Sequence, residues 1–405
     1  MKRPIGLAYT DARGRIFFDA ASQPLADGGL LRPVLRSELI RAPKGTMPVM
    51  LPGRTPLLGH GRAARRTALG ALLPAGYTRL LLPAYDERAG APPLPLFGYA
   101  FACVVDDELH VAAMRTDEDP NWRPRTFAQG ELEATVGRRM HGDERNPVLR
   151  QLARCSLEYG CFTAQNVFLA RGEAALPVSP RCNARCVGCI SELEPEAGIP
   201  SPQDRIGYEA TVDALARIAI RHLENAPDGI LSFGQGCEGE PLLRATTIAR
   251  TIEKIRASSS SGTINLNTNG SRPKSLRMLI DAGLQAVRIS LNSFRPGVYA
   301  AYYRPRGYAL DDVLESVRIA GDEGLRVSLN LLTHPGITDE AEEVSSMAAF
   351  LRETPVSLVQ TRTLNIDPHR YFALVGRPKE PLGMRAALAA IRNAGASVGN
   401  FTHTH

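Results

Sequence analysis

Two patterns of hydrophobic and polar positions divide the chain near residue 173. Before it, short apolar runs alternate with turns, and half of the 30 prolines fall within residues 1–150, which predicts short strands joined by turns. Beyond it, apolar runs of strand length alternate with stretches whose apolar residues recur at helical spacing, as Val212, Leu215, Ile218 and Leu223 do. Strands alternating with helices are typical of βα units around a parallel sheet.

The second region holds six such units. The expected strands are 174–178, 229–233, 263–267, 286–291, 326–331 and 356–360. A closed eight-unit barrel needs about 250 residues, more than this region offers. We therefore expect an α/β fold with a partial (β/α)6 barrel at 173–395, preceded by a smaller β-rich accessory domain at 1–172 and followed by a C-terminal tail at 396–405.

Composition narrows the class of protein. The 405 residues are 44% hydrophobic and 22% charged, which suits a globular protein. The N-terminus lacks the apolar core of a signal peptide, and no stretch approaches the roughly 18 uncharged apolar residues of a membrane span. We expect a cytoplasmic protein that does not interact with membranes. Its seven cysteines are an odd number, which argues against a disulfide framework and favours metal or redox chemistry.

The net charge of +6 is concentrated near the N-terminus. Residues 1–80 carry 13 Lys/Arg and 4 Asp/Glu, including the cluster Arg62, Arg65 and Arg66. A solvated surface is the simpler interpretation of this excess. An anionic partner such as nucleic acid is the alternative, although no zinc finger or RNA-recognition motif supports it.

Three cysteines follow the first strand of the second region. Cys182, Cys186 and Cys189 form C-x3-C-x2-C, so one short loop can reach three corners of a [4Fe–4S] cube, for which thiolates are the usual ligands. A structural zinc site would need a fourth nearby Cys or His, and neither follows before His222. Three ligands leave one iron open to a small molecule.

This loop, placed directly after the first strand, resembles that of the radical S-adenosylmethionine (SAM) superfamily, and the resemblance covers about residues 173–395. It implies a partial barrel of the radical SAM type in which each of the three cysteines binds one iron and SAM chelates the fourth. It also implies reductive cleavage of SAM to methionine and a 5′-deoxyadenosyl radical, which abstracts hydrogen from a substrate. The electron would come from an external donor such as flavodoxin or ferredoxin. One position departs from the family: Gly188 replaces the usual aromatic residue before the third cysteine.

The loop after the second strand admits two interpretations. Gly234, Gly236 and Gly239 have the G-x-G-x-x-G spacing of a dinucleotide site, but that motif belongs to a first βα unit, which the cysteine loop occupies here. The loop instead resembles the superfamily's Gly-Gly-Glu-Pro segment, with Glu238 where the first glycine is common. The resemblance implies that the backbone around Gly239 and the carboxylate of Glu240 hold the SAM ammonium. A Glu240 that only caps a helix is the alternative.

Polar residues at the ends of later strands complete the expected site. Alternation places Arg288, Ser290 and Asn292 on the inner face of the fourth strand, where polar groups need partners that a cofactor can supply. The expected cofactor-binding residues are Gly239, Glu240, Asn269, Ser290, Asn292 and Asn330. Asn330 and Gln360 are also candidates to face adenine or substrate at the mouth of the barrel.

Three of the other cysteines are candidate ligands of a second metal site. Cys155 and Cys161, with Cys237 and a fourth ligand, are candidates for an auxiliary cluster, but C-x5-C is a weak spacing for one. We expect Cys103 to be a buried residue that packs as an apolar side chain. No cysteine follows Cys237, so the C-terminal auxiliary-cluster domain of many peptide-modifying members of the superfamily is absent.

These features predict a radical SAM enzyme, an oxidoreductase or transferase, whose substrate is an unidentified small molecule or macromolecule. One alternative is a member that makes a glycyl radical on a partner protein, docking through the basic N-terminal region. The other is a non-catalytic iron–sulfur or zinc module that binds a partner.

Overall fold

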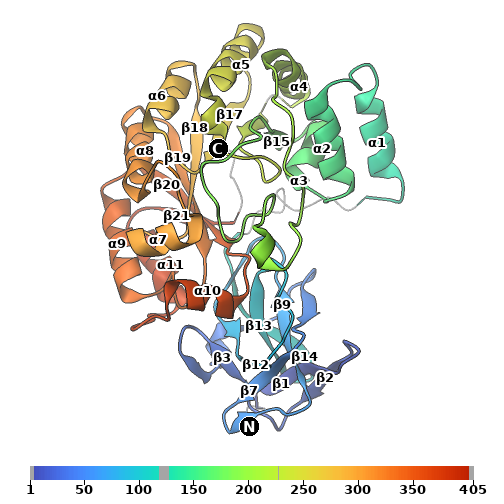
Figure 1. Ribbon diagram of the computed structural model, residues 1–405, viewed down its shortest axis with the longest axis vertical. Coiled ribbons are helices and arrows are strands. Elements are labelled where there is room, and N and C mark those ends of the chain that lie inside the picture. Colours follow the sequence, from blue (N-terminus) through green and yellow to red (C-terminus); the bar gives the residue numbers. More distant parts are fainter. Residues whose placement is uncertain (1–3, 118–126, 227, 401–405) are drawn as a thin grey trace.

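The computed structural model describes residues 4–117, 127–226 and 228–400. Figure 1 shows a lower part built of antiparallel strands and an upper part in which helices surround a parallel sheet. This arrangement confirms the expected α/β fold with a β-rich N-terminal region. None of the helices in the described ranges is long and apolar enough to span a bilayer.

The N-terminal part consists of short strands whose pairings are all antiparallel. Its main path runs in the order β10-β14-β13-β1-β9-β6. The strands are β1 (Gly6–Thr10), β2 (Ile16–Asp19), β3 (Leu25–Asp27), β4 (Leu31–Pro33), β5 (Leu39–Arg41), β6 (Met47–Met50), β7 (Arg54–Leu58), β8 (Gly61–Arg62), β9 (Thr67–Leu72), β10 (Tyr77–Arg79), β11 (Leu82–Pro83), β12 (Tyr85–Glu87), β13 (Tyr99–Val105) and β14 (Glu108–Arg115). In the basic cluster, Arg62 pairs with Asp86 and Arg66 with Asp19, so neighbouring carboxylates offset part of the local charge.

Three helices, α1 (Glu131–Met140), α2 (Pro147–Leu157) and α3 (Phe162–Leu169), come between the two sheets in the sequence and lie at the side of the upper part, next to β15 (Figure 1). They lie inside the segment expected to be β-rich. Helix α2 begins where the side chain of Asn146 accepts hydrogen bonds from the backbone N–H groups of Val148 and Leu149, with Pro147 in the first helical turn. Each of these helices is only two or three turns long, so its apolar spacing repeats few times. The turn residues between the helices then dominate the sequence pattern of this region.

The barrel sheet is parallel, and its strands follow chain order. They are β15 (Glu173–Leu176), β16 (Ile230–Phe233), β17 (Thr263–Thr268), β18 (Ala286–Leu291), β19 (Arg326–Thr333), β20 (Val356–Thr363) and β21 (Ser397–Gly399). The six expected strands are present. The seventh, β21, pairs with β20 inside the segment expected to be a tail, and its three residues are too few to produce a periodic signal. Residues 401–405 of that tail lie outside the described residues.

Helices cover the outer face of this sheet. They are α4 (Val212–Asn225), α5 (Ala245–Ser258), α6 (Pro273–Asp281), α7 (Pro296–Tyr303), α8 (Leu310–Asp322), α9 (Ala341–Arg352), α10 (Pro368–Val375) and α11 (Met384–Asn393). Short 3-10 helices span Arg36–Glu38, Pro195–Ala197 and Pro241–Arg244. Along β18, the buried Val287, Ile289 and Leu291 belong to the core shared with the helices, which leaves Arg288 and Ser290 on the inner face.

Buried polar contacts join the two parts. Arg54, whose side chain is 1% exposed, forms an ion pair with Asp367 at 2.9 Å. Arg79 donates to the carbonyl oxygens of Tyr99 and Leu364 at 3.0 and 2.9 Å. A guanidinium taken out of water needs such partners, so the N-terminal part is held firmly against the end of β20.

Candidate active site

The cysteine loop that follows β15 is clamped on two sides. The backbone N–H groups of Gly239 and Glu240 donate to the carbonyl oxygens of Ser179 and Arg181 at 2.7 and 2.8 Å. On the other side, Arg185 and Val187 donate from their backbone N–H groups to carbonyl oxygens of α7 at 3.0 Å. These bonds fix both the entry and the middle of the loop.

Close approach explains the glycine at position 239. A Cβ added there would lie 2.0 Å from the carbonyl oxygen of Arg181, which is inside contact distance. Gly239 therefore allows the loop after β16 to touch the cysteine loop directly.

Glu238 ties the same two loops together with its side chain. One carboxylate oxygen accepts from the backbone N–H groups of Val178 and Ser179, both at 2.7 Å, and the other from Gly234 and Gln235 at 2.9 and 2.8 Å. Burial raises the pKa of Glu238 to about 8, against the opposing effect of these donors. A carboxylate thus takes the place in which the family commonly has a glycine.

The loop carries three cysteines within eight residues. Cys182, Cys186 and Cys189 are half-buried free thiols. Burial, reinforced by the neighbouring sulfurs, raises the pKa of Cys186 well above its usual value, and burial raises that of Cys182 to about 11. Arg205 donates from Nη2 to the sulfur of Cys189 at 3.4 Å.

Glu240 stands beside this loop and is 3% exposed. One carboxylate oxygen accepts from the hydroxyl of Thr268 at 2.5 Å and from the backbone N–H of Leu242 at 2.9 Å, and the other accepts from the backbone N–H of Asn269 at 2.8 Å. Burial raises the pKa of Glu240 to about 7. The bond to Leu242 caps a short 3-10 helix, so Glu240 does cap a helix, but it also lines the cavity described next.

A cavity of about 690 Å³ opens over the inner face of the barrel. Five of the six expected cofactor-binding residues line it: Gly239, Glu240, Asn269, Ser290 and Asn330. Helices α2 and α3 supply part of its wall, and Ala75 adds a contribution from the N-terminal part. The volume suits a ligand of small-molecule size.

The comparisons with known proteins agree with this arrangement. A family model described as the radical SAM superfamily matches residues 176–348, which include the cysteine loop and β16 to β19. Residues 176–348 form a radical SAM domain.

Relatives of this chain match it over part of their length. GTP 3′,8-cyclase from Desulforamulus reducens is 31% identical over 187 residues, which are 45% of this chain and 52% of that protein. Probable GTP 3′,8-cyclase from Methanocella arvoryzae is 28% identical over 225 residues, 54% of this chain and 65% of that protein. The chain thus spans about half to two thirds of these relatives. A solved radical SAM methyltransferase from Sphaerobacter thermophilus aligns with a TM-score of 0.40 at 13% identity, covering 56% of this chain and 65% of that one.

Two expected site residues lie elsewhere in this radical SAM barrel. Asn292 follows the end of β18 and does not line the cavity; its amide donates to the hydroxyl of Tyr371 at 2.9 Å and to the carbonyl oxygen of Val298 at 3.4 Å. Gln360 pairs in register with Asn330 but is fully buried and does not line the cavity either. Strand alternation does not show that β18 has ended before Asn292, nor that the inner-face residue Gln360 is covered.

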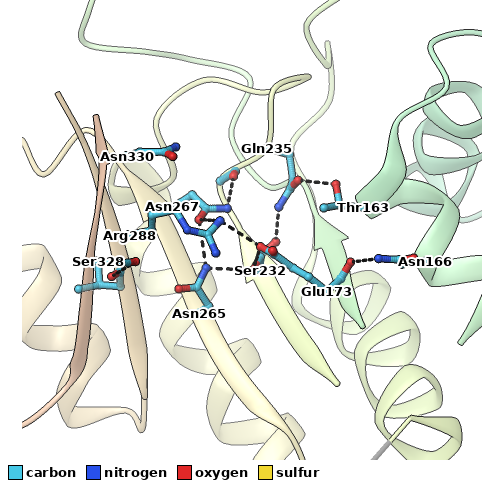
Figure 2. Close-up of polar contacts among 12 residues, drawn as sticks. Thr163, Asn166, Glu173, Ser232, Gln235, Asn265, Asn267, Arg288, Ser328 and Asn330 are labelled. Atoms are coloured by element: carbon cyan, nitrogen blue, oxygen red, sulfur yellow. Dashed lines mark hydrogen bonds and ion pairs between the residues drawn. The ribbon is translucent and has the colours of Figure 1, made fainter. Parts of the chain in front are cut away.

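The inner face of the barrel carries a polar network that sequence reasoning identified only in part (Figure 2). Glu173 pairs with Arg288 at 3.2 Å and accepts from the hydroxyl of Ser232 at 2.6 Å. Arg288 also donates to Asn267 at 2.9 Å. The sequence pattern did not indicate Glu173 because it is the first residue of β15, whose other residues are apolar. A single polar residue at the start of a strand does not show an alternation. Arg362, a further cavity residue, lies two positions after Gln360 on the same strand face.

Cys155, Cys161 and Cys237 come together on the cavity wall. The thiols of Cys155 and Cys237 are hydrogen-bonded, which lowers the pKa of Cys155 and raises that of Cys237. The backbone N–H of Cys161 donates to the carbonyl oxygen of Cys155 at 2.9 Å. In the part of the chain that the structure describes, no three His, Cys, Asp or Glu side chains are arranged as ligands of one metal ion, and this holds for the cysteine loop as well as for these three cysteines. The auxiliary cluster stays a prediction.

Proposed function

We propose that this protein is a radical SAM enzyme whose active site is the cavity between the cysteine loop and the inner face of the barrel. One observation carries the proposal: Glu240, whose backbone N–H is bonded to the cysteine loop at Arg181, lines a cavity of about 690 Å³. The chain covers only part of the relatives that it matches, so its activity and substrate are inferred from this site.

The residues fit a [4Fe–4S] cluster and SAM. Cys182, Cys186 and Cys189 supply three sulfur ligands from a loop that backbone hydrogen bonds hold on both sides. Burial raises the pKa of Cys182 and of Cys186, and a bound iron cluster would provide the positive charge that favours their thiolates. When bound, the cluster and SAM would supply a 5′-deoxyadenosyl radical.

The remaining residues of the site would bind SAM and orient it. The carboxylate of Glu240 is positioned to accept the SAM ammonium, and the hydroxyl of Thr268 and two backbone N–H groups hold it in place. Asn269, Ser290 and Asn330 offer neutral hydrogen-bonding groups along the same wall. Helices α2 and α3 shield this wall from solvent, which protects a radical from unwanted reactions.

Binding of SAM tests this assignment directly. We expect SAM to bind the cluster-loaded protein and to bind Glu240→Gln at least about tenfold more weakly, while iron content stays near that of the wild type, because a charge-assisted hydrogen bond is lost. Glu224→Gln, on the exposed face of α4, is the matched control. Equal affinity in wild type and Glu240→Gln would remove Glu240 from the site.

The substrate is a separate question. The names of the relatives make GTP one candidate, and a glycyl radical on a partner protein is another. A reduced flavodoxin or ferredoxin is the proposed electron donor. Transfer of deuterium from a labelled candidate into 5′-deoxyadenosine would identify the substrate, and the absence of transfer from a given candidate would exclude it.

A further inference from the structure

Two arginines and two glutamates are the charged side chains among the described residues that line the cavity: Arg288, Arg362, Glu173 and Glu240. Glu240 already accepts three hydrogen bonds beside the cysteine loop, and Glu173 forms an ion pair with Arg288. Arg362 is left without a carboxylate of its own.

Arg362 is a half-buried cation with few partners. Its Nε donates to the side-chain oxygen of Asn330 at 3.4 Å, which is the one hydrogen bond that its guanidinium makes to the described residues, and it forms no ion pair with them. Burial, together with the repulsion of Arg288, lowers the pKa of Arg362 to about 10. The carboxylates of Glu173 and Asp117 act on it only from a longer range. The guanidinium still carries its charge at neutral pH, facing a space that a ligand can enter.

We propose that Arg362, supported by Arg288, binds an oxyanion of the substrate, a phosphate or a carboxylate. A buried guanidinium is stabilised by an anion that accepts two of its N–H groups at once, and the planar fork of arginine matches both oxyanions. Asn330 orients the Nε edge of Arg362 and so leaves the other N–H groups for a ligand. This inference rests on the proposed function, since it assigns a substrate class to the same cavity.

The surrounding groups fit an anion rather than a second cation. Glu173 is neutralised by Arg288 and also accepts from the hydroxyl of Ser232 (Figure 2). The other polar neighbours of this end are neutral: Ser290, Asn267 and Asn330. Because the expected SAM-binding residues line the same cavity, an anion held at Arg362 would anchor a substrate in the cavity that also holds SAM.

Calorimetric titration of the cluster-loaded protein tests this proposal. The probes are inorganic phosphate, inorganic pyrophosphate and malonate, in chloride buffer of constant ionic strength. We expect at least one probe to bind the wild type and to bind Arg362→Gln at least about tenfold more weakly. The probe that binds with the higher affinity shows whether the site prefers a phosphate or a carboxylate. Arg352→Gln, which removes the same charge from an exposed position at the end of α9, is expected to bind like the wild type.

The outcomes separate this proposal from the proposed function. Thermal melting establishes that each variant is folded, and Arg362→Lys should restore part of the binding because it keeps the charge. Equal binding by wild type and Arg362→Gln, equal weakening by Arg352→Gln, or the absence of binding by every probe overturns the anion site. Anion binding does not require the cluster, so Cys186→Ala should retain it. Failure of SAM cleavage would contradict the proposed function and leave the anion result intact.

Discussion

A Cβ added to Gly188 would lie 2.8 Å from the hydroxyl oxygen of Tyr302. Tyr302 belongs to α7, and its ring is buried against Tyr303 and Tyr371. The family's usual aromatic residue at position 188 would have to occupy this space. The tyrosine of α7 therefore explains why this cysteine loop has a glycine before its third cysteine.

Gly188→Ala should lower the free energy of unfolding by roughly 1–3 kcal/mol, because the methyl group overpacks a filled site. The loss should be smaller in a Tyr302→Phe background, which removes the nearest atom and leaves the Asn365 carbonyl oxygen at 3.1 Å as the closest contact. Urea unfolding of the four proteins of this double-mutant cycle measures the coupling. Equal losses in both backgrounds would show that the hydroxyl does not determine the choice of glycine.

Glu238→Gln should destabilise the protein although glutamine has nearly the same size as glutamate. The amide group of glutamine would place N–H donors against two of the four backbone donors that the carboxylate now accepts. We expect a loss of roughly 1–3 kcal/mol in unfolding free energy and faster loss of iron from the reconstituted protein. The exposed Glu224→Gln is the control. Iron retention like that of the wild type would show that Glu238 does not hold the cysteine loop.

His334 should make the protein less stable in mild acid. Its ring is 1% exposed between Tyr371 and Phe372, and burial, with Arg79 and Arg377 adding repulsion, lowers its pKa well below 6.5. The unfolded chain takes up a proton below about pH 6.5 and the folded chain does not, so stability falls as pH falls through this value.

The comparison variant is His334→Gln. Between pH 7.5 and 5.5, the wild type should lose about 1 kcal/mol more unfolding free energy than the variant, since one pH unit below the unfolded pKa corresponds to roughly 1.4 kcal/mol. Denaturant unfolding at each pH measures both slopes. Parallel slopes would show that His334 is protonated equally in both states.

Iron content distinguishes one cluster from two. We predict about four irons per chain after reconstitution, the content of one [4Fe–4S] cluster, with the same value in a Cys155/Cys161/Cys237 triple serine variant. About eight irons in the wild type, falling to about four in the triple variant, would establish the auxiliary cluster instead.

Local sequence signals predicted the parts of the site that lie on one stretch of chain. Spacing within a few residues predicted the cysteine loop and the loop that contains Gly239 and Glu240. Alternation along one strand predicted which residues of β18 face inward. The positions that were missed depend on tertiary packing. Asn292 turns toward Tyr371 because the strand has ended, and the single hydrogen bond of Arg362 emerges only when β19 and β20 are paired in register. Short elements such as β21 and the helices α1 to α3 carry too few residues for a clear period.

Cleavage of SAM is the most direct measure of the proposed activity. With dithionite or reduced flavodoxin under anaerobic conditions, we predict that the reconstituted wild-type protein converts SAM to 5′-deoxyadenosine, and that Cys186→Ala forms none. A fully loaded wild-type protein that forms no 5′-deoxyadenosine with either reductant, or a Cys186→Ala variant that forms as much as the wild type, would contradict the assignment.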